Sequence, residues 1–145
     1  MLILWLIKKV LVLLGFLKPR ILIFDNSPSP EWWDGEIKEK MEKHFEVKIV
    51  NSHFSIVELQ KFNPDSIIID YGLDLNGGEL SQYLIRNGVK NSKFILWTIY
   101  YGSKNLMEYI TQNCKVAKKR IVEKISFSNS RSQINKLFRL LRSMA

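Results

Sequence analysis

Polar side chains capable of chemistry directly follow four short apolar runs in this 145-residue sequence. Asp25 and Asn26 follow residues 21–24, and Asp70 follows residues 66–69. Thr98 follows residues 94–97, and Lys124 follows residues 121–123. In an open parallel α/β sheet, ligands bind beyond the carboxyl ends of the strands. If the four runs are parallel strands, then carboxylates, an amide, a hydroxyl and an ammonium group meet at one edge. Such a set suits a Mg²⁺ ion and a phosphoryl group.

The segments between these runs predict the helices that would connect parallel strands. Ser55 is a suitable N-cap for a helix that ends before Asn63 and Pro64. Continuous apolar strands are typical of a sheet covered on both faces, and βαβ units have right-handed crossovers. We therefore predict an α/β fold, (βα)5, with a doubly wound parallel five-stranded sheet in the order 2-1-3-4-5. The predicted strands are 20–24, 47–50, 66–70, 93–97 and 120–123, and the predicted helices lie within 31–44, 56–62, 79–86, 105–113 and 130–143.

Length and composition fit one globular domain. A chain of 145 residues, with 46% hydrophobic and 25% charged residues, can bury one substantial core. Its one cysteine, Cys114, excludes an internal disulfide and has no partner set for a metal site. We expect a reducing, cytoplasmic location.

Charge is spread unevenly along the chain. Residues 1–80 carry 9 Lys/Arg and 12 Asp/Glu, a net charge of −3, whereas residues 81–145 carry 13 and 2, a net charge of +11. This asymmetry indicates an acidic partner, an anionic membrane or nucleic acid. A solvated basic face without a dedicated ligand explains it equally well.

Residues 1–17 form an apolar block that Lys8 and Lys9 interrupt. The block is shorter than the ~20 residues that span a bilayer, and it lacks the order of a signal peptide. Three interpretations stand side by side: a helix lying on a membrane, a helix covering the domain or a partner, or an extension from a non-native start. We divide the chain into this N-terminal extension, residues 1–19, and one domain, residues 20–145.

Residues 20–143 resemble the receiver domain of two-component response regulators. Five features carry the resemblance, and they occur in the family's order on the matching element ends. They are the pair Asp25-Asn26, Asp70, Leu73 with Gly78-Glu79-Leu80, Thr98 and Lys124. The resemblance implies a flavodoxin-like, CheY-like fold and a stand-alone signalling domain of a phosphorelay rather than an enzyme.

The resemblance also implies a role for each site residue. Asp70 would be the phosphoacceptor, Thr98 would hydrogen-bond a phosphoryl oxygen, and Lys124 would pair with the carboxylate and then the phosphoryl group. The implied Mg²⁺ ligands are Asp25, Asn26, Asp70 and the backbone carbonyl of Gly72. The phosphodonor would be a histidine kinase or a phosphotransfer protein. The output surface would be the helix 4–strand 5–helix 5 face, formed by the fourth predicted helix (105–113), the fifth predicted strand (120–123) and the fifth predicted helix (130–143).

Three positions depart from the family pattern. Asn26 replaces the second acid of the usual pair, which lowers the negative charge available to Mg²⁺. Ile99 stands where a small residue is usual, and Ile125 replaces a cis-proline, so its peptide bond is expected to be trans. These changes leave open an alternative: a degenerate pseudo-receiver that acts as a phosphorylation-independent interaction module, at a membrane or an acidic partner.

Basic residues gather before the last strand and on the last helix. In a receiver these positions fall on or near the output face, where like charges would disfavour a tight symmetric dimer. We therefore expect an acidic output partner and a monomer or weak dimer. Direct binding to nucleic acid is not expected, because no helix-turn-helix pattern stands apart. Membrane contact through residues 1–17 would make the protein membrane-peripheral.

Overall fold

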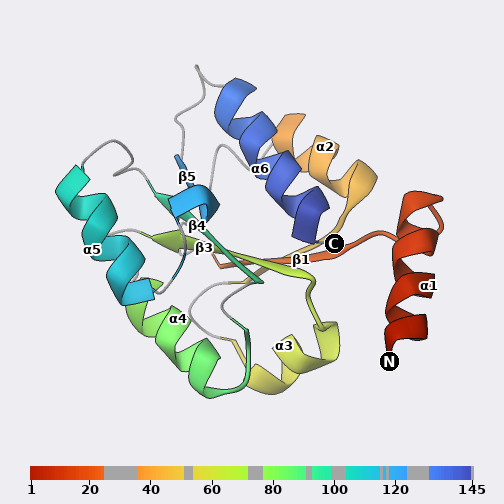
Figure 1. Ribbon diagram of the computed structural model, residues 1–145, viewed down its shortest axis with the longest axis horizontal. Coiled ribbons are helices and arrows are strands. Elements are labelled where there is room, and N and C mark those ends of the chain that lie inside the picture. The colour runs from red at the N-terminus through yellow and green to blue at the C-terminus, as the bar shows by residue number, and fades with distance from the viewer. Residues whose placement is uncertain are drawn as a thin grey trace.

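Short strands and helices alternate along the chain in the computed structural model (Figure 1). The structure describes residues 1–24, 36–50, 54–71, 77–90, 93–98, 104–114, 116, 118–123 and 131–144. The strands are β1 (Arg20–Phe24), β2 (Glu46–Val50), β3 (Ser66–Tyr71), β4 (Phe94–Thr98) and β5 (Ile121–Glu123). The helices are α1 (Leu2–Leu13), α2 (Glu36–His44), α3 (Ile56–Phe62), α4 (Gly77–Arg86), α5 (Lys104–Cys114) and α6 (Arg131–Met144), with a 3-10 turn at Lys118–Arg120.

The five strands form one sheet in the order β2-β1-β3-β4-β5, and each neighbouring pair is parallel. This confirms the predicted fold class and strand order. The strand ends differ from the prediction by one residue at several places. β3 continues past Asp70 to Tyr71, because Tyr71 still pairs with Thr98 across the ladder. Pairing with a neighbouring strand, rather than the local apolar pattern, therefore sets where β3 ends.

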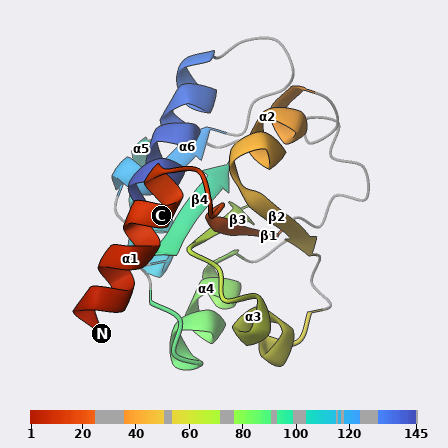
Figure 2. The same ribbon diagram turned by 90° about the vertical axis from the view of Figure 1, so that its right-hand side faces the viewer.

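The core has two layers, one on each face of the sheet. Along β3, Ile67 and Ile69 pack into one layer and Ile68 into the other, as the period of two in a strand requires. Leu59 of α3 and Leu84 of α4 complete the first layer. Residues of α2 and α6 complete the second layer, and Figure 2 shows these two helices together on one side of the sheet.

Turn and cap residues set the ends of the connecting helices. The Ser55 hydroxyl accepts a hydrogen bond from the Val57 N–H at 3.2 Å, which caps the start of α3 as predicted. Asn63 ends the same helix with a left-handed backbone, φ 48°. Gly88 closes the end of α4 with φ 86°, a conformation that glycine adopts without steric cost.

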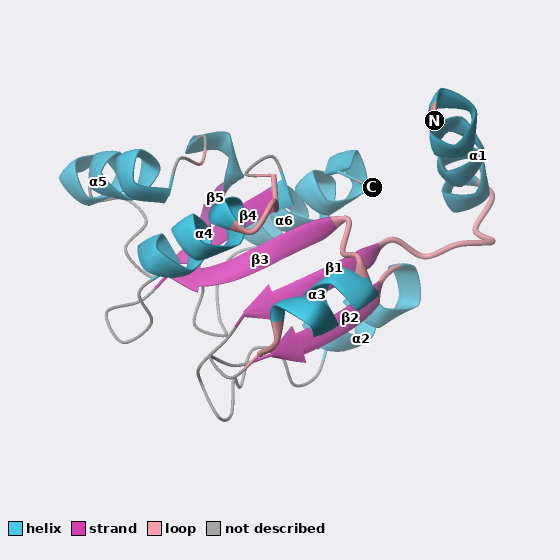
Figure 3. Ribbon diagram, turned by 90° about the horizontal axis from the view of Figure 1, so that it is seen from below, coloured by secondary structure: helices cyan, strands magenta, loops and turns pink. Residues whose placement is uncertain are grey.

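α1 lies apart from the sheet, at the edge where the strands begin (Figure 3). Its Lys8 ammonium forms an ion pair with Asp65, the residue before β3. None of the α1 residues is buried. Within the described ranges, no helix combines the length and apolar character needed to cross a bilayer. The division into residues 1–19 and 20–145 stays a prediction.

Candidate functional site

The carboxyl ends of the central strands bring two of the predicted site residues to one edge of the sheet. Asp70 is the penultimate residue of β3 and lies opposite Trp97 of β4. Thr98 ends β4, where it pairs with Tyr71 on one side and with Glu123 of β5 on the other. Asp70 and Thr98 therefore lie on adjacent strands, and the β3 residue that pairs with Thr98 is the one after Asp70.

Two further predicted residues come directly after strand ends in the sequence. β1 ends on the residue before Asp25, and β5 ends on the residue before Lys124. The ladder pairs the last residue of β1, Phe24, with Ile69, the residue before Asp70. The predicted positions outside the described part of the chain are Asp25, Asn26, Gly72, Leu73, Ile99, Lys124 and Ile125.

The segments leading to this edge are held by burial on both faces of the sheet. Ile67, Ile68 and Ile69, which lead to Asp70, are each at most 1% exposed. Ile95 and Leu96, which precede Trp97 and Thr98, are fully buried. A site at the ends of such strands is positioned by packing, as a preorganised site requires.

The donor set predicted for Mg²⁺ fits that ion chemically. Carboxylate, amide and backbone carbonyl oxygens are the hard ligands that Mg²⁺ takes, together with water. Among the residues that the structure describes, no three His, Cys, Asp or Glu side chains form a cluster suited to a metal ion. Of the predicted ligands, only Asp70 has a described backbone position, so the ligand set stays a prediction.

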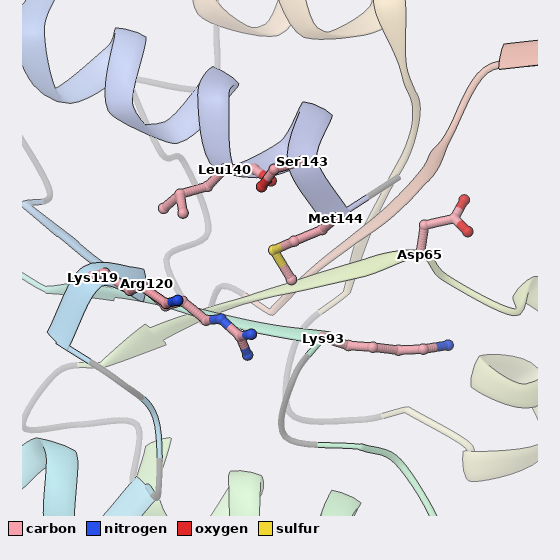
Figure 4. A pocket seen from close by; sticks show the side chains of 7 residues that line it. All are labelled: Asp65, Lys93, Lys119, Arg120, Leu140, Ser143 and Met144. Atoms are coloured by element: carbon pink, nitrogen blue, oxygen red, sulfur yellow. The ribbon is translucent and has the colours of Figure 1, made fainter. Parts of the chain in front are cut away.

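Sequence reasoning missed a basic hollow at the opposite edge, where the strands begin (Figure 4). It has a volume of about 470 Å³. In this view, cationic side chains line the lower side of the hollow, and the end of α6 lies above it. Its lining includes Lys93, Lys119, Arg120, Asp65, Leu140 and Met144. The Lys and Arg residues before β4 and β5 were the sequence signal for this hollow. Only the fold shows that these two strands start side by side.

Asp65 connects the start of β1 and α1 at this edge through hydrogen bonds and an ion pair. Its Oδ2 accepts a hydrogen bond from the Arg20 N–H at 2.8 Å, and its own N–H donates to the Arg20 carbonyl at 2.8 Å. Its other oxygen pairs with Lys8 of α1. The neighbouring Lys93 ammonium donates to the Pro64 carbonyl at 3.0 Å.

The basic residues that were predicted to lie on or near the output face occupy different places in the structure. The Lys136 ammonium of α6 donates to the Ile121 carbonyl of β5 at 2.8 Å, so this cation helps to dock the helix on the sheet. Lys119 and Arg120 line the hollow at the strand-start edge. Arg139 and Arg142 are exposed on α6.

Comparison with solved structures shows the class of fold. The signal receiver domain of a Luxo repressor protein from Vibrio parahaemolyticus aligns with a TM-score of 0.61 and 20% identity, over 88% of this chain and 93% of that chain. The receiver domain of a Francisella response regulator aligns with a TM-score of 0.60 and 19% identity, over 88% of this chain and 96% of that chain. The chain therefore has the receiver-domain fold of response regulators.

Comparison with known sequences adds little to the fold. No protein-family model matches the chain. A protein of Acanthamoeba polyphaga mimivirus, named as an ankyrin repeat protein, is 36% identical over 62 residues, which is 40% of this chain. The match spans only 10% of the length of that protein.

Proposed function

We propose that the chain is a receiver-type signalling domain that accepts a phosphoryl group on Asp70 with Mg²⁺. The observation that carries the proposal is the strand register: Asp70 pairs with Trp97, the residue before Thr98 on the adjacent strand, and β1 and β5 end on the residues before Asp25 and Lys124. The receiver-domain fold of the two aligned structures supports the same assignment of the edge.

The chemistry assigned to Asp70 is nucleophilic. One oxygen of its carboxylate attacks the phosphorus of a phosphohistidine, the new O–P bond forms an acyl phosphate, and the N–P bond breaks. The departing imidazole takes up a proton. When bound, Mg²⁺ would neutralise charge on the phosphoryl oxygens, held by Asp25, Asn26, Asp70 and the backbone carbonyl of Gly72. Thr98 would donate a hydrogen bond to a phosphoryl oxygen, and Lys124 would pair with another.

We further propose a phosphoryl donor, an output partner and a location for the protein. The donor is a histidine kinase or phosphotransfer protein, and the output partner is acidic, because Arg139 and Arg142 present exposed positive charge on α6. The expected location is the cytoplasm, and the domain signals as a monomer or weak dimer.

Incubation with acetyl phosphate and Mg²⁺, followed by intact mass measurement, tests the proposal. The expected result is a gain of one phosphoryl group that EDTA prevents and that Asp70→Asn abolishes. Asp65→Asn is the matched control, because it makes the same change just before the start of the same strand, and it should keep the gain. An unchanged wild-type mass, under conditions that phosphorylate a known receiver, would contradict the proposal.

A second candidate is a pseudo-receiver that binds its partner without phosphorylation. Asn26, Ile99 and Ile125 favour it, because they alter the metal, donor-access and lysine-placing positions of the family pattern. In that case the wild-type mass stays unchanged, and Asp70→Ala binds the output partner as tightly as wild type does.

A further inference from the structure

α1 exposes more apolar surface than any other part of the described structure. Its apolar side chains that are 44% to 84% exposed are Leu2, Ile3, Leu4, Trp5, Leu6, Ile7, Val10 and Leu13. Soluble proteins rarely leave a contiguous apolar patch of this kind uncovered, and such patches mark sites of contact with proteins or membranes. The shape and charge of this end of the molecule indicate what kind of surface binds the apolar patch.

The side of α1 that carries Lys8 faces the body of the protein. Lys8 pairs with Asp65 at the start of β3, and the Lys9 ammonium lies 5.5 Å from the centre of the Trp5 ring. With 3.6 residues per turn, the remaining apolar residues follow one another around an uninterrupted arc of about 200°. The part of this arc opposite Lys8, which includes Leu6 and Val10, therefore points away from the sheet.

The width of the arc favours a lipid surface over a second copy of the chain. A partner helix covers a stripe of about 100°, and a coiled-coil seam is narrower still. A helix that lies in the plane of a membrane is immersed over about half its circumference, which this arc matches. Lys8 and Lys9 lie outside the arc, where their ammonium groups reach the aqueous side.

Charge at the same end specifies the kind of lipid. The hollow lined by Lys93, Lys119 and Arg120 adjoins Asp65, which in turn holds Lys8 of α1. The apolar helix (Figure 3) and the basic hollow (Figure 4) thus both lie at the edge where the strands begin. Lys and Arg next to an apolar anchor are attracted to anionic headgroups.

We propose that α1 is an in-plane anchor that binds an anionic bilayer together with the basic strand-start edge. The helix has 12 residues and is about 18 Å long, against a hydrocarbon core of ~30 Å. The strands separate this edge from the carboxyl-end edge by about 16 Å. Asp70 therefore lies at the end away from the lipid, on the side where the arrowheads lie in Figure 3.

Flotation of the full chain with phosphatidylcholine vesicles, with and without phosphatidylserine, tests the anchor. Wild type should float with the phosphatidylserine vesicles, and Leu6→Glu with Val10→Glu should weaken binding at least tenfold. The matched control is Val57→Glu with Tyr109→Glu, which adds the same two charges at exposed positions of α3 and α5 and should bind like wild type.

A second pair of variants tests the headgroup charge. Lys119→Gln, at the hollow, should weaken binding to phosphatidylserine vesicles about fivefold. Lys104→Gln removes the same charge at the start of α5, which follows the carboxyl end of β4, and should leave binding unchanged. Asp70→Asn should also bind like wild type, so the anchor can fail or hold independently of phosphorylation.

Three results would overturn the proposal. The first is wild type that stays unbound by both kinds of vesicle. The second is equal binding by the Leu6→Glu, Val10→Glu variant and wild type. The third is a stable dimer in analytical ultracentrifugation that the same α1 variant dissociates and that does not bind vesicles, since a second copy would then cover the helix.

Discussion

Asp65 shows how one side chain can organise an edge of the sheet. It lies before β3, accepts the Arg20 N–H at the start of β1 and pairs with Lys8 of α1. Its side chain is 12% exposed, whereas that of Lys8 is 46% exposed. A carboxylate that accepts a backbone N–H in a nearly buried position contributes more than a half-exposed ion pair does.

Asp65→Ala should therefore lower the free energy of unfolding by about 1.5–3 kcal/mol. The loss leaves the Arg20 N–H without its acceptor at the start of a central strand. Lys8→Ala breaks only the ion pair and should cost less than about 1 kcal/mol. Urea unfolding of both variants measures the difference, and equal losses would show that the ion pair is the main contribution.

At the scale of elements, capping residues determine where the short helices begin. α3 has only seven residues, and its Ser55 cap satisfies one of the N–H groups that the first turn leaves without a partner. Leu59 is its one buried residue, so the helix has little other packing to hold its start.

Ser55→Ala should lower the free energy of unfolding by about 1 kcal/mol. Ser143→Ala is the matched control, because its hydroxyl donates to the Leu140 carbonyl at the exposed end of α6. That variant should stay within about 0.5 kcal/mol of wild type. Thermal unfolding followed by circular dichroism measures both, and a smaller loss at Ser55 than at Ser143 would contradict the role of the cap.

Most elements could be predicted because their signals are local. Ser55, Asn63 and Pro64 mark the bounds of α3. The helical spacing of Leu137, Phe138 and Leu141 is a local signal of the same kind, and all three are buried in α6. The extension of β3 to Tyr71 could not be predicted, because it depends on pairing with Thr98. The roles of Asp65 and Lys136 were missed for the same reason: their partners are 45 and 15 residues away in sequence.

The candidate site could be predicted only as far as its topology. Parallel order places Asp70 and Thr98 at one edge, and the register agrees. Asp25 and Lys124 lie outside the described residues, and the apolar pattern does not determine their distances from Asp70. The basic hollow was missed because Lys93 and Arg120 meet only when β4 and β5 lie side by side.

At the scale of the whole molecule, the two core layers and α1 play separate parts. The layers bury Ile68 and Leu141 on one face and Leu84 and Leu96 on the other, whereas α1 contributes no buried residue. The stability of the fold should therefore depend on the layers and hardly at all on α1.

Ile68→Ala should lower the free energy of unfolding by about 2–5 kcal/mol, because it leaves a cavity in the middle of the sheet. Leu6→Ala removes an apolar group that is already 56% exposed in α1 and should change stability by less than about 0.5 kcal/mol. Urea unfolding compares the two, and a loss at Leu6 like that at Ile68 would mean that α1 packs as part of the core.

The placement of α1 and Asp70 at opposite ends of the strands has a consequence for the rate of signalling. A domain held on a surface by one end searches for its donor in two dimensions, with the other end free to meet it. Two proteins confined in this way meet at an effective concentration set by the surface rather than by the cell volume. Phosphorylation by a membrane-bound kinase would then respond to the area shared by the two proteins more than to the number of copies in the cytoplasm.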